Sequence, residues 1–245
     1  VDRIASLCAT TIICVSPSVL KHSIEDRLAP ASKQLILHKG TCCGIDTEGK
    51  FNPKNIDSQK LAHMKAKWGI TDSDWVIGYS GRLVRDKGII ELVRAFRDLK
   101  KEHANYKLLL VGMFEVRDAL PDDVQQDIKN DSQIVWTDFQ NSDMEYFYSM
   151  MNVYVLASYR EGFPTGVLGA QAMQVPVITT RATGCCDSIQ EGVTGLFVEH
   201  DVDQLSDAIR RIHDTSSSVD GNKAREWVQT NFENHIVWNE IEKLY

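Results

Sequence analysis

The stretch "VYVLASYREGFPTGVLGAQAMQVPVITT", residues 153–180, indicates how the rest of the chain folds. It begins and ends with the short apolar runs "VYVLAS" and "VPVITT". Apolar runs without polar alternation are typical of strands buried on both faces of a parallel sheet. The segment between them contains Gly162 and Pro164, which indicate a turn followed by the first turn of a helix. The stretch therefore predicts a strand–helix–strand unit.

The same alternation extends toward the N-terminus of the chain. Further apolar runs that we expect to form strands are residues 10–16, 34–38, 75–80, 106–112 and 133–137. In residues 88–103, between two of these runs, apolar side chains recur at helical spacing. Repeated strand–helix–strand units predict an α/β fold with a doubly wound, Rossmann-like parallel sheet. After Glu199 the sequence is nearly all helical in pattern.

The composition is that of a globular protein with a sizeable core. The 245 residues include 43% hydrophobic residues and carry a net charge of −7. This acidic balance disfavours nucleic acid as the main partner, since phosphate binding usually needs a basic face. It leaves room for a local basic pocket that binds a small phosphate ligand. No apolar run reaches the length of a membrane span.

The six cysteines do not form a recognisable metal or disulfide pattern. None of them shows the C-x₂-C spacing of a zinc site, so we expect reduced thiols, some of them buried. Reduced thiols agree with a cytoplasmic protein.

The loop "GRLVRDKG", residues 81–88, follows one expected strand and opens a helix. In open parallel sheets, ligands bind at the carboxyl ends of the strands. Gly81 allows a tight turn, and Arg82 and Lys87 bring two cations to a helix N-terminus, where free N–H groups favour anions. The loop can therefore hold a diphosphate, with a solvated basic loop as the alternative.

A second loop places Glu161 just before a predicted helix. We expect the backbone N–H groups of Thr165, Gly166 and Val167 to point into the same cleft. A carboxylate accepts hydrogen bonds and amides donate them, so the pair suits a polyhydroxylated ligand. The alternative is an acid that merely interacts with the helix dipole, which contributes less than about 1 kcal/mol.

Two aromatic residues near a third strand end leave two alternatives open. Trp136 and Phe139 can line a pocket for a nucleotide base, or they can belong to the core, as aromatic residues at strand ends usually do.

Taken together, "GRLVRDKG", "SYREGFP" followed by "TGCCDSI", and "EGVTGLFV" resemble one family in their order and spacing. The family is the retaining GT-B glycosyltransferases of the family-four type (glycosyl transferases group 1), in its nucleotide-sugar-binding half. The motifs look most like those of enzymes that assemble bacterial capsular or surface polysaccharides. The resemblance implies the C-terminal half of a GT-B fold. Residues 1–45 would be a remnant of the acceptor domain and linker, 46–230 the nucleotide-sugar-binding domain, and 231–245 a crossover helix.

The resemblance also implies roles for individual residues. Arg82 and Lys87 match the pair that holds the donor's diphosphate, and Glu161 matches the first acid of the family's E-x₇-E motif, which meets the donor sugar's hydroxyls. The implied catalytic residues are Glu161, Arg82 and Lys87. The implied donor-binding positions are Gly81, Arg82, Lys87, Glu161, Gly162, Phe163, Pro164, Thr165 and Gly169.

One of these positions departs from the family pattern. The second acid of the motif, which grips the ribose hydroxyls, should lie eight residues after Glu161, where this chain has Gly169. Glycine has no side chain that can accept a hydrogen bond. Gln171 lies two residues further on, roughly 200° around a helix, and is a poor substitute.

The activity that the resemblance implies is sugar transfer with retention of configuration. The donor would be a nucleotide diphosphate sugar, most simply a UDP-sugar, and the acceptor a glycan or a lipid-linked molecule. No cofactor or metal would be required, because Arg, Lys and helix amides neutralise the charge on the departing diphosphate. We expect this chain to bind nucleotide but to transfer sugar poorly without the rest of the acceptor domain. Peripheral association of the full-length protein with the inner face of the membrane is compatible with this activity.

Two alternatives remain open. A degenerate, non-catalytic domain that binds a nucleotide or a partner is supported by Gly169. A non-hydrolysing sugar-nucleotide epimerase has similar architecture, but such enzymes lack the "EGFP" signature.

Overall fold

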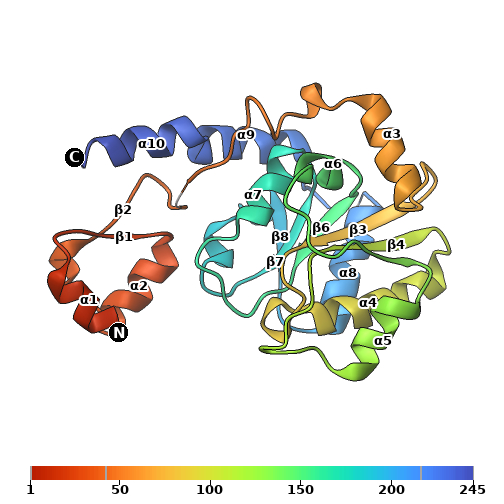
Figure 1. The fold of residues 1–245 in the computed structure, drawn as a ribbon, viewed down its shortest axis with the longest axis horizontal. Coiled ribbons are helices and arrows are strands. Elements are labelled where there is room, and N and C mark those ends of the chain that lie inside the picture. The colour runs from red at the N-terminus through yellow and green to blue at the C-terminus, as the bar shows by residue number, and fades with distance from the viewer. Residues whose placement is uncertain (1, 42, 216, 245) are drawn as a thin grey trace.

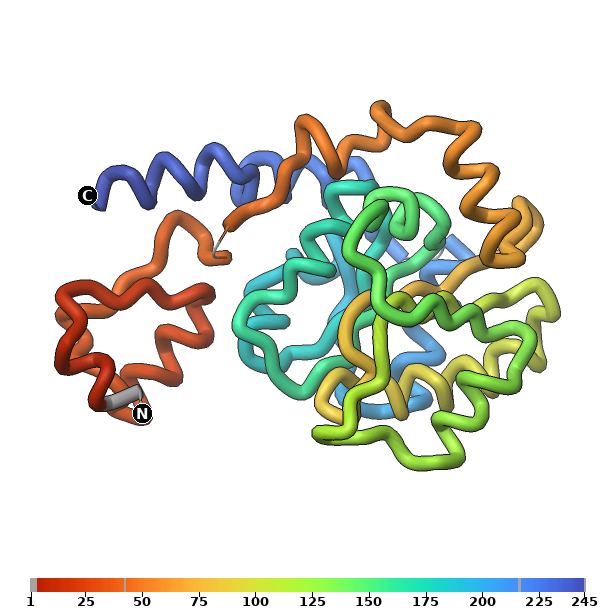
Figure 2. Tube along the Cα trace, in the orientation of Figure 1, coloured from red at the N-terminus to blue at the C-terminus, as the bar shows by residue number. Residues whose placement is uncertain are grey.

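The computed structural model describes residues 2–41, 43–215 and 217–244, and its main body is a six-stranded sheet (Figures 1 and 2). The strand order is β5-β4-β3-β6-β7-β8, and every pairing in the sheet is parallel. The strands are β3 (Trp75–Ser80), β4 (Tyr106–Val111), β5 (Ile134–Trp136), β6 (Val153–Leu156), β7 (Val177–Thr180) and β8 (Gly195–Val198). The predicted doubly wound parallel sheet is confirmed.

Helices cover both faces of this sheet (Figure 1). They are α3 (Ser58–Lys67), α4 (Ile89–Glu102), α5 (Asp122–Asn130), α6 (Met144–Ser149), α7 (Thr165–Ala172), α8 (Val202–His213) and α9 (Gly221–Phe232), whereas α10 (Asn234–Glu242) follows α9 and extends away from the sheet. Helix α4 packs against α5 and α8, whereas α7 packs against α6 and α9. The amphipathic helix predicted in residues 88–103 corresponds to α4. Its apolar positions, such as Leu92 and Phe96, are buried.

The core lies where the central strands meet these two helical layers. Ile77, Leu109 and Val155 are fully buried in three neighbouring strands. Burying one such side chain stabilises the fold by about 1.5–3 kcal/mol, which is why uninterrupted apolar runs form the centre of the sheet. None of the described helices has both the length and the apolar character needed to cross a membrane.

The N-terminal segment forms a small unit beside the main body (Figure 1). It consists of α1 (Asp2–Cys8), β1 (Ile12–Cys14), α2 (Pro17–Glu25) and β2 (Gln34–Ile36), and its two strands pair in parallel. It touches the main body through Ser18, whose hydroxyl donates to Asp187 Oδ2 at 2.5 Å and accepts from the Gly184 N–H at 2.7 Å. The segment therefore faces the loops that follow β7.

The connection between the two units is held against the C-terminal helices. Arg225 of α9 donates to the carbonyl oxygens of Thr47 at 2.7 Å, Phe51 at 2.8 Å and Ala172 at 2.6 Å. The Thr47 N–H donates to the buried Glu233 carboxylate at 2.9 Å. Glu233, at φ −56° and ψ 135°, is not helical and separates α9 from α10, which continues toward the side of the N-terminal segment (Figure 2).

Sequence pattern and structure differ mainly at strand ends. Strand β8 was not predicted, since its four residues follow a glycine-containing turn. Residues 153–158 were expected as one strand, but β6 ends at Leu156. The residues beyond it leave the sheet and form part of the candidate site.

Candidate functional site

The candidate site lies at the carboxyl ends of β3, β6 and β7. A cleft of about 1000 Å³ separates this edge of the sheet from the N-terminal segment. On the sheet side it is lined by Arg82, Asp86, Lys87, Arg160, Glu161, Gly162 and Thr183. On the other side it is lined largely by apolar residues around β1, such as Ile12 and Val15.

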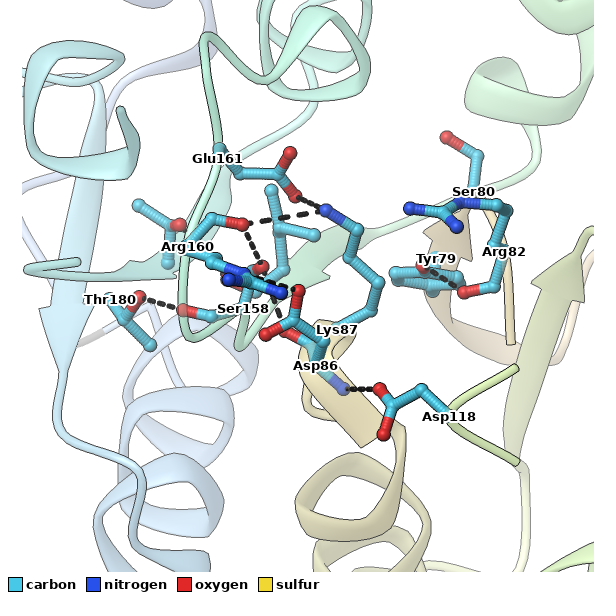
Figure 3. A network of polar contacts seen from close by, with 12 residues as sticks. Tyr79, Ser80, Arg82, Asp86, Lys87, Asp118, Ser158, Arg160, Glu161 and Thr180 are labelled. Carbon is cyan, nitrogen blue, oxygen red and sulfur yellow. Dashed lines mark hydrogen bonds and ion pairs between the residues drawn. The ribbon is translucent and has the colours of Figure 1, made fainter. Parts of the chain in front are cut away.

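The centre of the site is an ion pair between Lys87 and Glu161. Lys87 Nζ lies 2.6 Å from Glu161 Oε1, and the two side chains are only 13% and 16% exposed (Figure 3). The Lys87 ammonium also reaches the Arg160 carbonyl oxygen at 3.5 Å. Two residues 74 apart in sequence are thus brought together in a partly dehydrated place, where their interaction is stronger than in water.

A glycine explains how Lys87 reaches Glu161. Lys87 ends the 3₁₀ turn η3 (Arg85–Lys87), and Gly88, at φ 69°, closes this turn and starts α4. A Cβ atom at Gly88 would lie 2.1 Å from the carbonyl oxygen of Ala157. Only glycine therefore allows the loop after β3 to press against the end of β6.

A second glycine holds the loop that carries Glu161. The Glu161 N–H donates to the Thr183 carbonyl oxygen at 2.9 Å. At Gly184, with φ 77°, a Cβ atom would lie 2.5 Å from the Glu161 carbonyl oxygen and 2.6 Å from that of Gly162. The loops after β6 and β7 are therefore in direct backbone contact.

A polar network that the sequence analysis missed supports these loops (Figure 3). The buried Ser158 hydroxyl lies within hydrogen-bond distance of the carbonyl oxygens of Asp86, at 3.0 Å, and Arg160, at 2.9 Å. Thr180 donates to the Ser158 carbonyl oxygen at 2.6 Å. Asp86 in turn accepts from Arg160 Nε at 3.0 Å and, through its N–H, donates to Asp118 at 2.8 Å. The signal in the sequence was a polar residue, Ser158, at the end of a buried apolar run.

Arg82 reaches the same cleft but is held more loosely than Lys87. Its side chain is 55% exposed, and Nη1 pairs with Glu115 at 2.8 Å. The Tyr79 hydroxyl donates to the Arg82 carbonyl oxygen at 2.8 Å. Gly81 is needed before it, because a Cβ atom there would lie 2.7 Å from the Tyr79 hydroxyl. Burial and the nearby Glu161 carboxylate raise the Tyr79 pKa, so this phenol stays neutral.

A second, smaller pocket of about 520 Å³ shares Arg82 with the cleft. Phe139, 62% exposed, lines this pocket. Trp136 does not line it: its indole N–H donates to the Gly112 carbonyl oxygen at 2.7 Å, and its ring packs on Phe114. Of the two aromatic residues, the structure therefore places only Phe139 where a ligand can reach it.

The start of α7 only partly matches the expectation. Thr165 and Gly166 line the smaller pocket. The expectation that the Val167 N–H points into the cleft was wrong, because this group donates to the Pro164 carbonyl oxygen at 3.0 Å. The Phe163 ring packs 5.2 Å from the ring of Phe232, so its side chain belongs to the packing against α9.

The position expected for a second acid is closed. Gly169 is buried, and a Cβ atom there would lie 2.7 Å from Cε2 of Tyr148. Gln171 is fully buried and donates to the Ser188 carbonyl oxygen at 2.9 Å, on the side of η4 (Cys185–Asp187). The Gln171 side chain is thus used in packing, and its description as a poor substitute for the acid stays a prediction.

Comparison with known proteins shows the family to which the sequence is similar and several similar proteins. The sequence profile of the family "Glycosyl transferases group 1" matches residues 62–232. The chain is 35% identical over 247 residues to the capsular polysaccharide biosynthesis glycosyltransferase CapM of Staphylococcus aureus, covering 100% of this chain and 63% of that protein. It is 28% identical over 191 residues to a lipopolysaccharide 1,2-N-acetylglucosaminetransferase of Salmonella typhimurium, covering 75% and 47%. The chain thus spans less than two thirds of these relatives.

Two crystal structures have the same fold at low sequence identity. A glycosyltransferase from Rickettsia africae matches with a TM-score of 0.83 and 22% identity, covering 96% of this chain and 62% of that one. Anabaena HepE in complex with UDP-glucose matches with a TM-score of 0.83 and 18% identity, covering 99% and 65%. These likenesses confirm the predicted GT-B type of α/β fold.

Proposed function

The chain belongs to the glycosyl transferases group 1 family, and on that basis we propose that it supplies the donor-binding part of a retaining glycosyltransferase. The donor is a UDP-sugar, and the acceptor is a glycan or lipid-linked intermediate of a bacterial surface polysaccharide such as a capsule. The observation that carries the proposal is the partly buried Lys87–Glu161 pair at the carboxyl edge of the sheet, with Arg82 lining the same cleft. The similarity to CapM supports the polysaccharide product, and the HepE complex supports the donor.

In this proposal Lys87 and Arg82 bind the diphosphate and Glu161 binds hydroxyls of the transferred sugar. The bond between the anomeric carbon and the diphosphate oxygen breaks, and its electron pair stays on the diphosphate. The acceptor oxygen bonds to the same face of the anomeric carbon, and its proton passes to the diphosphate. Lys87 and Arg82 stabilise the growing negative charge without a metal ion, since fixed cations in a partly dehydrated site act strongly on the transition state.

Glu161 prepares Lys87 for this role. Its Oε1 lies 2.6 Å from Lys87 Nζ, so it offsets the cost of placing an ammonium group in a position that is only 13% exposed. Each carboxylate oxygen can accept more than one hydrogen bond, so Glu161 retains acceptor capacity for sugar hydroxyls.

The N-terminal segment, residues 1–45, is on this proposal a remnant of the acceptor domain with its linker, and residues 46–230 form the donor-binding domain. The segment from 231 to 245 returns to the acceptor side. The mostly apolar residues that the N-terminal segment presents to the cleft are one wall of the acceptor site. This chain alone would bind nucleotide in the cytoplasm but transfer sugar poorly.

One observation favours a second candidate, a non-catalytic domain that binds nucleotide or a partner. Position 169 carries a glycine in place of the motif's second acid, and the Tyr148 ring packs against it. The partly buried Lys87–Glu161 ion pair favours the first candidate, because a domain that binds only a partner protein does not need a cation and a carboxylate together in this cleft.

Calorimetric titration with UDP and UDP-glucose tests the proposal. We expect saturable binding that Arg82→Ala weakens about tenfold, as the loss of a charge-assisted hydrogen bond predicts. Arg181→Ala is the matched control: Arg181 pairs with Glu191 at 2.9 Å and is 60% exposed, but it does not line the cleft. A wild-type chain that binds neither ligand would support the non-catalytic candidate, and equal losses in the two variants would refute the assignment of Arg82.

A further inference from the structure

Three hydroxyl groups meet beneath α7, between the sheet and the smaller pocket. Ser80 Oγ lies 3.0 Å from the Tyr148 hydroxyl and 3.3 Å from the Tyr154 hydroxyl. Tyr154 also donates to the Ser80 carbonyl oxygen at 3.2 Å. Ser80 ends β3, Tyr148 belongs to α6 and Tyr154 to β6, so three elements contribute one hydroxyl each.

Two glycines of α7 make room for this hydroxyl cluster. A Cβ atom at Gly166 would lie 2.4 Å from the Tyr154 hydroxyl and 3.1 Å from Ser80 Oγ. At Gly169, one turn further, a Cβ atom would lie 2.7 Å from Cε2 of Tyr148. Glycine within a helix is unfavourable compared with alanine, so two glycines on one face indicate a specific packing need.

Only part of the cluster is accessible to a ligand. Ser80 and Tyr148 line the pocket of about 520 Å³, whereas Tyr154 lies behind them. A phenol hydroxyl offers one donor and acceptor lone pairs, and its contact with Ser80 uses only one of these. Burial raises the pKa of Tyr148 to about 12, so it is a neutral donor at physiological pH.

The rest of the pocket indicates which part of a ligand meets these hydroxyls. Arg82 lines both this pocket and the larger cleft, so it marks where a bound diphosphate would pass from one to the other. Apolar side chains, Met113, Met144 and Phe139, line another part of the pocket. A neutral, hydroxyl-bearing unit between a diphosphate and a flat base fits the space, and in a nucleoside diphosphate that unit is the ribose.

We propose that Tyr148, paired with Ser80, recognises the ribose hydroxyls of the donor nucleotide, and that Gly169 allows Tyr148 to stand there. This inference rests on the proposed function and names a specificity-determining residue of the same site. In this inference the neutral phenol of Tyr148 on α6 binds the ribose hydroxyls, in place of a carboxylate at position 169 of α7. The exchange removes a negative charge from the neighbourhood of Arg82.

Titration of the chain with UDP, 2′-deoxy-UDP and 3′-deoxy-UDP tests this inference. Tyr148→Phe removes only the hydroxyl, so we expect UDP to bind about tenfold more weakly, as the loss of one hydrogen bond predicts. At least one deoxy analogue should bind Tyr148→Phe and wild type equally well. Tyr154→Phe is the matched control, because Tyr154 belongs to the hydroxyl cluster but does not line the pocket. It should discriminate between UDP and the deoxy analogues as wild type does.

The outcomes separate this inference from the proposed function. If wild type does not bind UDP, the proposed function itself is refuted. If wild type binds UDP and Tyr148→Phe keeps both the affinity and the discrimination, only the role of Tyr148 is refuted. Ser80→Ala provides a second route should Tyr148→Phe not fold, and it should also reduce the discrimination. Gly169→Glu should weaken UDP binding because its side chain displaces Tyr148, and tighter binding would overturn the inference.

Discussion

The two ends of the candidate site are built from different chemistry on the same sheet edge. At one end Lys87 and Glu161 form a close ion pair with little exposure. At the other end Ser80 and Tyr148 present neutral hydroxyls beside apolar side chains. Charges act strongly and over several ångströms, whereas hydroxyls act only at hydrogen-bond distance. We therefore expect the first end to control the chemical step and the second to control which nucleotide binds.

The largest expected effect comes from breaking the charged end with Glu161→Gln in the full-length enzyme. The amide cannot neutralise Lys87 and is a weaker acceptor for sugar hydroxyls, so the rate of transfer should fall by about 100-fold or more. UDP affinity should not fall, since Lys87 is released to bind the diphosphate. Measured rates of sugar transfer and calorimetry with UDP separate the two effects.

Glu191→Gln serves as the control for that change. Glu191 also pairs with a basic residue, Arg181, but does not line the cleft. An unchanged rate in Glu161→Gln would mean that the charged end has no role in the reaction.

The difference between the two ends also explains what the sequence could predict. Arg82, Lys87 and Glu161 were recognised because each follows a buried strand, and the rule that ligands bind at strand ends needs only the strand pattern. Helix α4 could also be predicted from the sequence, because residues buried on one face, such as Leu92 and Phe96, recur at helical spacing.

The neutral end could not be predicted in the same way. Tyr148 lies within the aromatic run of α6, which reads as core, and its contact with Ser80 joins residues 68 apart. Its relation to Gly169 depends on how α6 packs against α7, which no local pattern encodes. The incorrect expectation for Val167 has a similar cause, because the exact start of a helix decides which N–H groups remain free.

The next effect concerns the stability of the neutral end in alkaline solution. Burial raises the pKa of Tyr148 from its ordinary value of 10.0 to about 12. Below the unfolded pKa the phenol is protonated in both states. As the pH rises from 10 toward 12, the unfolded state loses the proton first, so the free energy of unfolding falls. One phenol accounts for at most about 2.7 kcal/mol, at about 1.36 kcal/mol per pKa unit.

Urea unfolding of wild type and Tyr148→Phe across this pH range measures how much the Tyr148 phenol contributes to the fall in the free energy of unfolding. Phenylalanine has no proton to lose, so the variant should lose less stability than wild type above pH 10.0. Equal losses would show that Tyr148 is not protected from water as the structure indicates.

A smaller effect is expected from Gly169→Ala. Alanine favours the helix by about 1 kcal/mol, but its Cβ atom must displace the Tyr148 ring, and overpacking of this kind costs about 1–3 kcal/mol. We expect a net loss of about 1 kcal/mol in the free energy of unfolding. In a Tyr148→Leu background the ring is absent, and the same change should become neutral or stabilising, which a double-mutant cycle measures. A stabilising effect of Gly169→Ala in the wild-type background would contradict the close packing between α6 and α7.

The smallest effect lies where the two ends meet, at Arg82 and Glu115. This pair is 55% and 34% exposed, so breaking it with Glu115→Gln should change the free energy of unfolding by less than about 1 kcal/mol. The change frees Arg82 from a competing carboxylate, and UDP should bind about two- to fivefold more tightly at low salt, with the gain shrinking as salt screens the charges. Calorimetry at two salt concentrations measures this, and Glu191→Gln, which frees Arg181 outside the cleft, should leave UDP affinity unchanged. Weaker UDP binding in Glu115→Gln would instead mean that Glu115 orients Arg82 toward the diphosphate, and the charged end of the site would then extend as far as Glu115.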